Sequence, residues 1–219
     1  MYKIAIDGPS ASGKTEVAKA LGKALNMLVV DTGAIYRTLT LYCLQQKVDI
    51  YNESSVIQNT KDVEVHLDHD DVYLNGKKVT DEIRSAAVSK ATAVVAKIPE
   101  IREKVTAIQR HLASTQNVVM QGRDITSVVL PDAEVKIYLN ATPEERACRR
   151  QKDLAVKGEN MSFEQVLKSI NERDNEDMTR TLSPLIKTED SIEIDSTNMT
   201  LNEVVEKIID IARKRGLKI

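Results

Sequence analysis

Near its N-terminus the chain reads Gly8-Pro9-Ser10-Ala11-Ser12-Gly13-Lys14-Thr15, which fits the pattern G-x-x-x-x-G-K-[S/T]. The apolar run 3–7 before it predicts a strand, and apolar residues at helical spacing after it, from Val17 to Leu25, predict a helix. In that setting the glycines let backbone N–H groups point at phosphate oxygens, Lys14 reaches the β and γ phosphates, and the Thr15 hydroxyl binds Mg²⁺. The motif therefore predicts a binding site for a nucleoside triphosphate, formed by all eight residues.

The rest of the chain repeats the order of a strand followed by a helix. Short apolar runs predict further strands at 27–30, 117–121, 135–139 and 192–194, each followed by a helical pattern. Capping-box patterns mark three helix starts, at Thr142 with Glu145, Ser162 with Gln165, and Thr200 with Glu203. These features favour an α/β fold of the P-loop type in three layers, with a five-stranded parallel sheet and helices on both faces.

One region departs from this order. Residues 63–74 alternate apolar and polar side chains around an acidic turn, which is typical of a small antiparallel meander. Two helical patterns follow, at about 80–97 and 99–114. We therefore expect residues 1–47 and 115–219 to form a core domain and residues 48–114 to form an insert, the kind of segment that usually carries substrate specificity.

Composition excludes several classes of protein. The chain has 219 residues, with 31 Lys and Arg against 33 Asp and Glu, so it lacks the broad basic face of a nucleic-acid binder. We find neither an apolar run as long as a membrane span nor a signal-peptide pattern, so we expect a cytoplasmic protein with no membrane partner. Cys43 and Cys148 are far apart in sequence and are expected to be buried free thiols.

A second group of charged residues indicates what accepts the phosphate. Arg37 follows Asp31-Thr32-Gly33, and Arg123-Asp124 follow the strand at 117–121, at the edge where open parallel sheets bind ligands. In the helix that begins near Ser162, the apolar stripe of Val166 and Ile170 continues into Arg173, Asp177 and Arg180.

An internal salt-bridge network would explain Arg173, Asp177 and Arg180 on their own. Several arginines together with a phosphate loop fit a phosphotransferase better, because arginine binds phosphate in a bidentate manner. The chain lacks the Asn-Lys-x-Asp motif of GTPases and the Leu-Ser-Gly-Gly-Gln motif of ABC-type ATPases. A kinase is therefore favoured over these two classes.

Further stretches of the chain are Asp31-Thr32-Gly33-Ala34-Ile35-Tyr36-Arg37, Ile98-Pro99-Glu100-Ile101-Arg102, Gly122-Arg123-Asp124-Ile125, Arg173-Asp174 and Ile194-Asp195-Ser196-Thr197. With the phosphate loop, they resemble the bacterial cytidylate (CMP) kinases of the P-loop nucleoside monophosphate kinase family, over nearly the whole chain. In that family a serine often stands where this chain has Ala93, beside Thr92.

The resemblance implies a magnesium-dependent enzyme that moves the γ-phosphoryl group of ATP to CMP or dCMP. It assigns Thr32 and Arg37 to the CMP phosphate region, Arg102 and Asp124 to the cytosine edge, Arg123 and Arg180 to phosphate, and Asp177 to the ribose hydroxyls. The expected catalytic residues are Lys14, Arg123, Arg173 and Arg180.

The resemblance also makes 48–114 an NMP-binding insert and places a short lid at about 150–165. Arg149 precedes that lid and is expected at the ATP site, whereas neighbouring Arg146 fits a solvated helix face equally well. We expect a monomer. Two alternatives remain open: the same chemistry on UMP or a non-nucleotide acceptor, and a nucleotide-binding regulatory module that acts through a protein partner.

Overall fold

The computed structural model describes residues 1–68, 71–156 and 158–218. They form two compact units, one of residues 1–27 and 117–219 and the other of residues 28–116. The predicted division at 48–114 is narrower than the second unit and stays a prediction.

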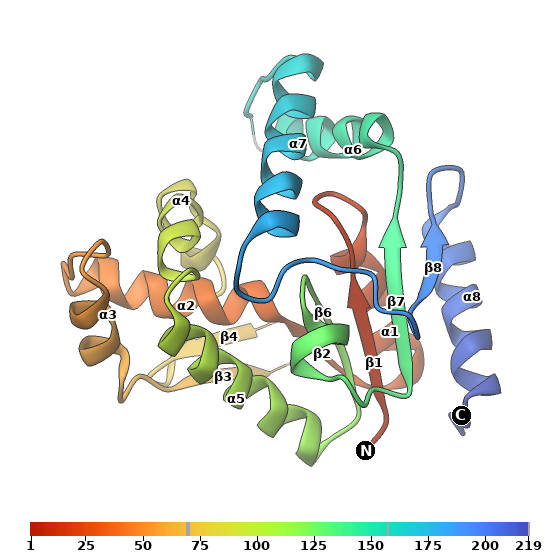
Figure 1. The fold of residues 1–219 in the computed structure, drawn as a ribbon, viewed down its shortest axis with the longest axis horizontal. Coiled ribbons are helices and arrows are strands. Elements are labelled where there is room, and N and C mark those ends of the chain that lie inside the picture. The colour runs from red at the N-terminus through yellow and green to blue at the C-terminus, as the bar shows by residue number, and fades with distance from the viewer. Residues whose placement is uncertain (69–70, 157, 219) are drawn as a thin grey trace. The chain divides into compact units, whose positions relative to one another are not determined.

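Five strands form the main parallel sheet, and the five sequence-predicted strands are confirmed to within one residue at each end. They are β1 (Lys3–Asp7), β2 (Leu28–Asp31), β6 (Val118–Gly122), β7 (Val135–Asn140) and β8 (Ile192–Asp195). Their order is β2-β6-β1-β7-β8 (Figure 1). Ile4, Ala5 and Ile6 of the central strand β1 are fully buried, as expected of a strand covered on both faces.

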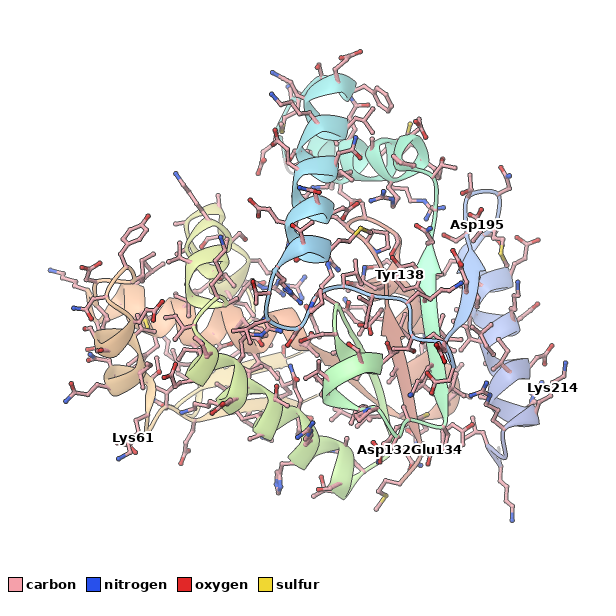
Figure 2. The ribbon with its side chains drawn as sticks, viewed as in Figure 1. Lys61, Asp132, Glu134, Tyr138, Asp195 and Lys214 are labelled. Carbon is pink, nitrogen blue, oxygen red and sulfur yellow. The ribbon has the colours of Figure 1, made fainter. Side chains whose placement is uncertain are left out.

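The two ends of this sheet have different roles. At the amino end, Lys3 of β1 forms an ion pair with Asp132 at 2.6 Å, and its backbone N–H donates to Glu134 at 2.8 Å. Figure 2 shows Asp132 and Glu134 at the opposite end of β7 from Tyr138. The carboxyl ends of β1, β6 and β7 therefore share the other edge, which is where ligands bind in open parallel sheets.

The helices of the first unit are α1 (Lys14–Leu25), α6 (Pro143–Val156), α7 (Phe163–Thr179) and α8 (Leu201–Lys214). The predicted capping boxes at Ser162 and Thr200 are confirmed. The box at Thr142 is only half formed. The Thr142 hydroxyl accepts from the Glu145 N–H at 3.3 Å, but the Glu145 carboxylate accepts from Arg149 Nε at 2.9 Å.

The second unit contains the predicted antiparallel meander, formed by β3 (Val65–Asp68), β4 (Asp71–Leu74) and β5 (Lys77–Lys78). The middle of its acidic turn, residues 69–70, lies outside the described residues. The helices of this unit are α2 (Thr32–Gln45), α3 (Glu53–Thr60), α4 (Ala86–Val95) and α5 (Pro99–Thr115).

The single helical pattern predicted at 80–97 is wrong in extent. A 3₁₀ turn at Glu82–Arg84 comes first, and α4 then begins after Ser85, whose side chain accepts from the Val88 N–H. Helix α3 was not predicted, because Val56 is the one apolar side chain that it buries.

The two cysteines differ in environment. Cys43 is buried, as predicted, but Cys148 is exposed, so that expectation is wrong for Cys148. Helix α6 buries Ala147 and Leu154, and Cys148 follows Ala147 by one position, off the buried face. Across the residues that the structure describes, no helix is both long and apolar enough to cross a membrane.

Candidate active site

The phosphate loop leaves β1 at its carboxyl end and enters α1. A Cβ atom at Gly8 would lie 2.0 Å from the carbonyl oxygen of Leu139 in β7, so the close approach of these strands requires glycine there. Gly13, directly before α1, has φ of 91°, and Ala11 has φ of 57°, which is uncommon for a residue with a side chain. The loop is therefore tightly curled.

Lys14 is folded into this loop. Its side chain is buried, and Nζ donates to the carbonyl oxygen of Pro9 at 2.6 Å and to Ser12 Oγ at 3.2 Å. Burial lowers the pKa of Lys14 well below its ordinary value, and the Arg123 charge lowers it further. A bound polyphosphate would favour the charged ammonium, since an anion offsets both of these effects.

Two further arginines contact the loop from α6. Arg149 donates from Nη2 to the Ser196 carbonyl oxygen at 2.8 Å and from Nη1 to Ser196 Oγ at 3.1 Å, and Nη1 lies 3.4 Å from the Ser12 carbonyl oxygen. The structure thus places Arg149 beside the loop. Arg146 is 5% exposed and pairs with Asp174 of α7, so the interpretation of Arg146 as a solvated residue is wrong.

The segment after β6 is held by Asp7, which is fully buried at the end of β1. Its carboxylate accepts from the backbone N–H of Ile125 at 3.0 Å and from the N–H and hydroxyl of Thr126, both at 2.7 Å. Burial raises the pKa of Asp7, and these three hydrogen bonds oppose the shift. The chain then makes a π-helical turn at Ile125–Val129, a form frequent at functional sites.

This turn fixes the residues directly before it, Arg123 and Asp124. Arg123 Nε donates to Asp177 Oδ2 at 2.7 Å, and Arg180 Nη1 lies 3.4 Å from Asp177 Oδ1. Arg180 Nε also donates to the Ser183 carbonyl oxygen at 2.7 Å. Two guanidinium groups thus share one carboxylate, which leaves an excess of positive charge, as a phosphate site requires.

Arg173 lies on the same helix, α7, as Asp177. It is exposed, whereas its neighbour Asp174 is buried, so the predicted inward stripe on α7 is wrong at Arg173. Helical spacing in the sequence did not predict that Asp174 is buried.

In the second unit, the predicted residues lie on α2 and α5. Arg37 Nη2 forms an ion pair with Asp31 at 2.7 Å, and its buried Nε has no hydrogen-bond partner among the described residues. Thr32, at the start of α2, is 5% exposed. Arg102 is buried, donates to the Ala96 carbonyl oxygen at 3.2 Å and lies 5.7 Å from the centre of the Tyr36 ring, within the range of a cation–π contact.

Within the described part of the chain, no group of three or more His, Cys, Asp or Glu residues is placed to hold a metal ion. The Thr15 hydroxyl in the first turn of α1 is an oxygen ligand of the type that Mg²⁺ accepts.

Comparison with known proteins finds relatives that match nearly the whole chain. A family model described as cytidylate kinase matches residues 4–214. Curated relatives named cytidylate kinase include those of Geobacillus sp. (strain WCH70), 46% identical and covering 97% of both chains, and of Fervidobacterium nodosum, 45% identical with the same coverage. A third, from Caldanaerobacter subterraneus subsp. tengcongensis, is 44% identical over 97% of this chain and 95% of its own.

Solved structures with this fold are more distant in sequence. An uncharacterized protein from Eubacterium ventriosum aligns with a TM-score of 0.54 at 13% identity, over 97% of this chain and 98% of its own. The protein TT1252 from Thermus thermophilus aligns with a TM-score of 0.50 at 18% identity, over 99% and 98%. At this level of identity the likeness concerns the fold alone.

Proposed function

This chain belongs to the cytidylate kinase family, and we propose that its phosphate loop and the arginines around Asp177 are the parts that carry out the reaction of the family. The protein transfers the γ-phosphoryl group of ATP to CMP or dCMP, which gives ADP and CDP or dCDP. The observation that carries the site assignment is the pairing of Arg123 and Arg180 on one carboxylate, in the same compact unit as the loop.

The ATP phosphates bind at Gly8–Thr15. Backbone N–H groups at the start of α1 and the Lys14 ammonium supply positive charge, because the amino end of a helix favours anions. Arg149 holds the loop at Ser12 and is close enough to add its charge. Mg²⁺ is bound by the Thr15 hydroxyl and mainly by the phosphates themselves, as it commonly is in kinases, and neutralises charge that develops during transfer.

Arg123 and Arg180 bind the acceptor phosphate, and the proposal also assigns Thr32 and Arg37 of α2 to contacts with CMP phosphate. Arginine is suited to this task because its planar group donates two parallel hydrogen bonds to phosphate. Arg37 has a buried Nε available for a further acceptor. Arg102 and Asp124 bind the cytosine edge, where a guanidinium donates to the ring carbonyl and a carboxylate accepts from the exocyclic amine.

Asp177 binds the ribose hydroxyls and also orients the arginines. Because both of its oxygens lie against guanidinium groups here, contact with ribose requires it to share those hydrogen bonds. Arg173 is proposed to act in catalysis, although it lies exposed on α7.

The chemistry follows from charge and position. The acceptor phosphate is already ionised, so no general base is needed, and alignment of donor and acceptor with neutralisation of the migrating group can supply most of the acceleration. Lys14, Arg123 and Arg180 provide that neutralisation.

The test is an assay that couples ADP release to an optical signal, with Mg-ATP and either CMP, dCMP, UMP, AMP, GMP or no acceptor. We expect CMP and dCMP to stimulate ADP release well above the other nucleotides. Equal or greater stimulation by UMP would support the alternative of a different pyrimidine acceptor. The comparison matters because Ala93 stands where the family often has a serine, and the hydroxyl of the neighbouring Thr92 already donates to the Val88 carbonyl oxygen at 2.7 Å. No stimulation by any acceptor would contradict the proposed function.

A further inference from the structure

A buried ion pair encloses the backbone of one residue of the phosphate loop, Ser10. Asp174 Oδ1 accepts from the Ser10 N–H at 2.8 Å, and Arg146 Nη1 donates to the Ser10 carbonyl oxygen at 3.0 Å. Arg146 and Asp174 also bond to each other, and their side chains are 6% and 8% exposed. Both backbone polar groups of Ser10 therefore bond to side chains from α6 and α7.

Arg146 is itself held in place by the main sheet. Its Nε donates to the carbonyl oxygen of Ala141, the residue that follows β7, at 3.1 Å. One guanidinium thus joins the end of a sheet strand, the phosphate loop and the Asp174 carboxylate. A planar group with donors in fixed directions can bridge three such partners only if all of them are correctly placed.

The next residue of the loop, Ala11, adds an apolar contact to the same helices. Its side chain packs against the buried cluster formed by Ala147, Leu154, Val166 and Ile170 of α6 and α7. Ala11 has φ of 57°, a conformation that costs free energy for any residue other than glycine and persists only where its surroundings hold it. The shape of the loop at 10–11 is therefore imposed by α6 and α7 as well as by its own glycines.

Helix α7 also reaches the arginine cluster. Asp174 and Asp177 are three residues apart, so they lie on neighbouring parts of one helix surface. Asp174 bonds the loop, while Asp177 bonds Arg123 and Arg180. The last turns of one helix thus contact both the loop that binds the phosphoryl donor and the arginines that bind the acceptor.

We propose that Arg146 and Asp174 are positioning residues that hold the phosphate loop in its anion-binding shape and tie it to the helix that orients Arg123 and Arg180. Neither contacts a reacting atom. They act through the backbone of Ser10, whose N–H is turned toward Asp174, so the N–H groups from Ala11 onward form the cradle for phosphate. The proposal deepens the proposed function and rests on it.

The decisive variant is the double substitution R146M/D174L. Removing one partner would leave a buried charge unpaired, whereas replacing both by apolar residues of similar size is often neutral for stability. Thermal unfolding, the Kd for Mg-ATP by calorimetry, and kcat with KM for ATP and for CMP are measured on the full chain. Lys168→Met is the matched control, because Lys168 forms an exposed pair with Glu172 on α7.

For the double variant we expect Tm to stay near the wild-type value, while the Kd and the KM for ATP rise at least tenfold and the KM for CMP changes less than twofold. The control should keep the Kd for Mg-ATP, kcat and both KM values within twofold of the wild-type values. A folded double variant with wild-type affinity for Mg-ATP would overturn the proposal and reduce the pair to a structural role.

If the double variant does not fold, Arg146→Lys decides the matter. Lysine keeps the charge opposite Asp174 but cannot donate to both Ser10 and Ala141 in the same geometry. Its Kd for Mg-ATP should still rise severalfold, and an unchanged Kd would refute the proposal. Because Kd is measured without an acceptor, failure of the wild-type protein to phosphorylate CMP would contradict the proposed function separately.

Discussion

Gly8→Ala tests whether the close approach of the phosphate loop to β7 is as strict as the geometry indicates. The added Cβ would lie 2.0 Å from the Leu139 carbonyl oxygen and 3.0 Å from its carbon. A normal carbon–oxygen contact is about 3.3 Å, so the loop and β7 must separate by about 1.3 Å. Such overpacking costs about 1–3 kcal/mol, and the backbone conformation at φ of 154° adds about 1–3 kcal/mol for a residue other than glycine.

The expected loss is therefore about 2–6 kcal/mol out of the about 5–15 kcal/mol that stabilises a typical domain. Urea unfolding followed by circular dichroism measures it, and calorimetry with Mg-ATP reports the effect on the loop. Gly216→Ala is the matched control in the same unit, because Gly216 has φ of 91° and, its chain neighbours aside, no atom of the described residues lies within 4 Å of an added Cβ. It should cost only the backbone part, about 1–2 kcal/mol. A loss for Gly8→Ala no larger than for Gly216→Ala would refute the steric argument.

Three other outcomes are expected. Arg180→Ala should lower kcat at least 100-fold, about 2.7 kcal/mol in the coupled ADP assay, and near-native turnover in a folded variant would refute its role. At about pH 8, Ellman's reagent should modify Cys148 rapidly and Cys43 only in denaturant, because burial raises the pKa of Cys43 to about 11; two fast thiols per native chain would contradict this. Burial also raises the pKa of Asp7, so the stability that its protonation supplies is present at low pH and lost as pH rises through the folded-state pKa. Urea unfolding should show the free energy of unfolding of wild type rising relative to that of Asp7→Asn as the pH is lowered from neutral toward the ordinary Asp pKa of about 3.9, and a constant difference would sink the idea.

The sequence predicted the elements whose signals are local. A buried parallel strand is a short run of apolar residues, and the phosphate loop is a fixed pattern between a strand and a helix, so neither depends on a distant partner. Helix α3 gave a fainter signal: in the structure Asn52 caps it by accepting from the Ser55 N–H at 3.1 Å, but α3 buries a single apolar side chain, Val56. The start of α4 at Ser85 was missed because it lies inside a longer helical pattern.

The charged residues of α7 were harder, and the reason is geometric. With 100° per residue, Val166 and Ile170 define a face centred at about 20°, and Arg173 then lies about 40° and Asp174 about 60° from that centre. Helical spacing therefore gives no ground for burying Asp174 in preference to Arg173. The groups that face α7 decide which of the two residues is buried. The Ser10 N–H and the Arg146 guanidinium both require an acceptor, and Asp174 supplies it. Ser10 lies in the loop near the N-terminus, whereas Arg146 and Asp174 lie on α6 and α7, so the burial of Asp174 depends on how those helices pack against the loop. A buried charge is placed by the partners that offset its desolvation, and those partners are defined only once the fold has formed.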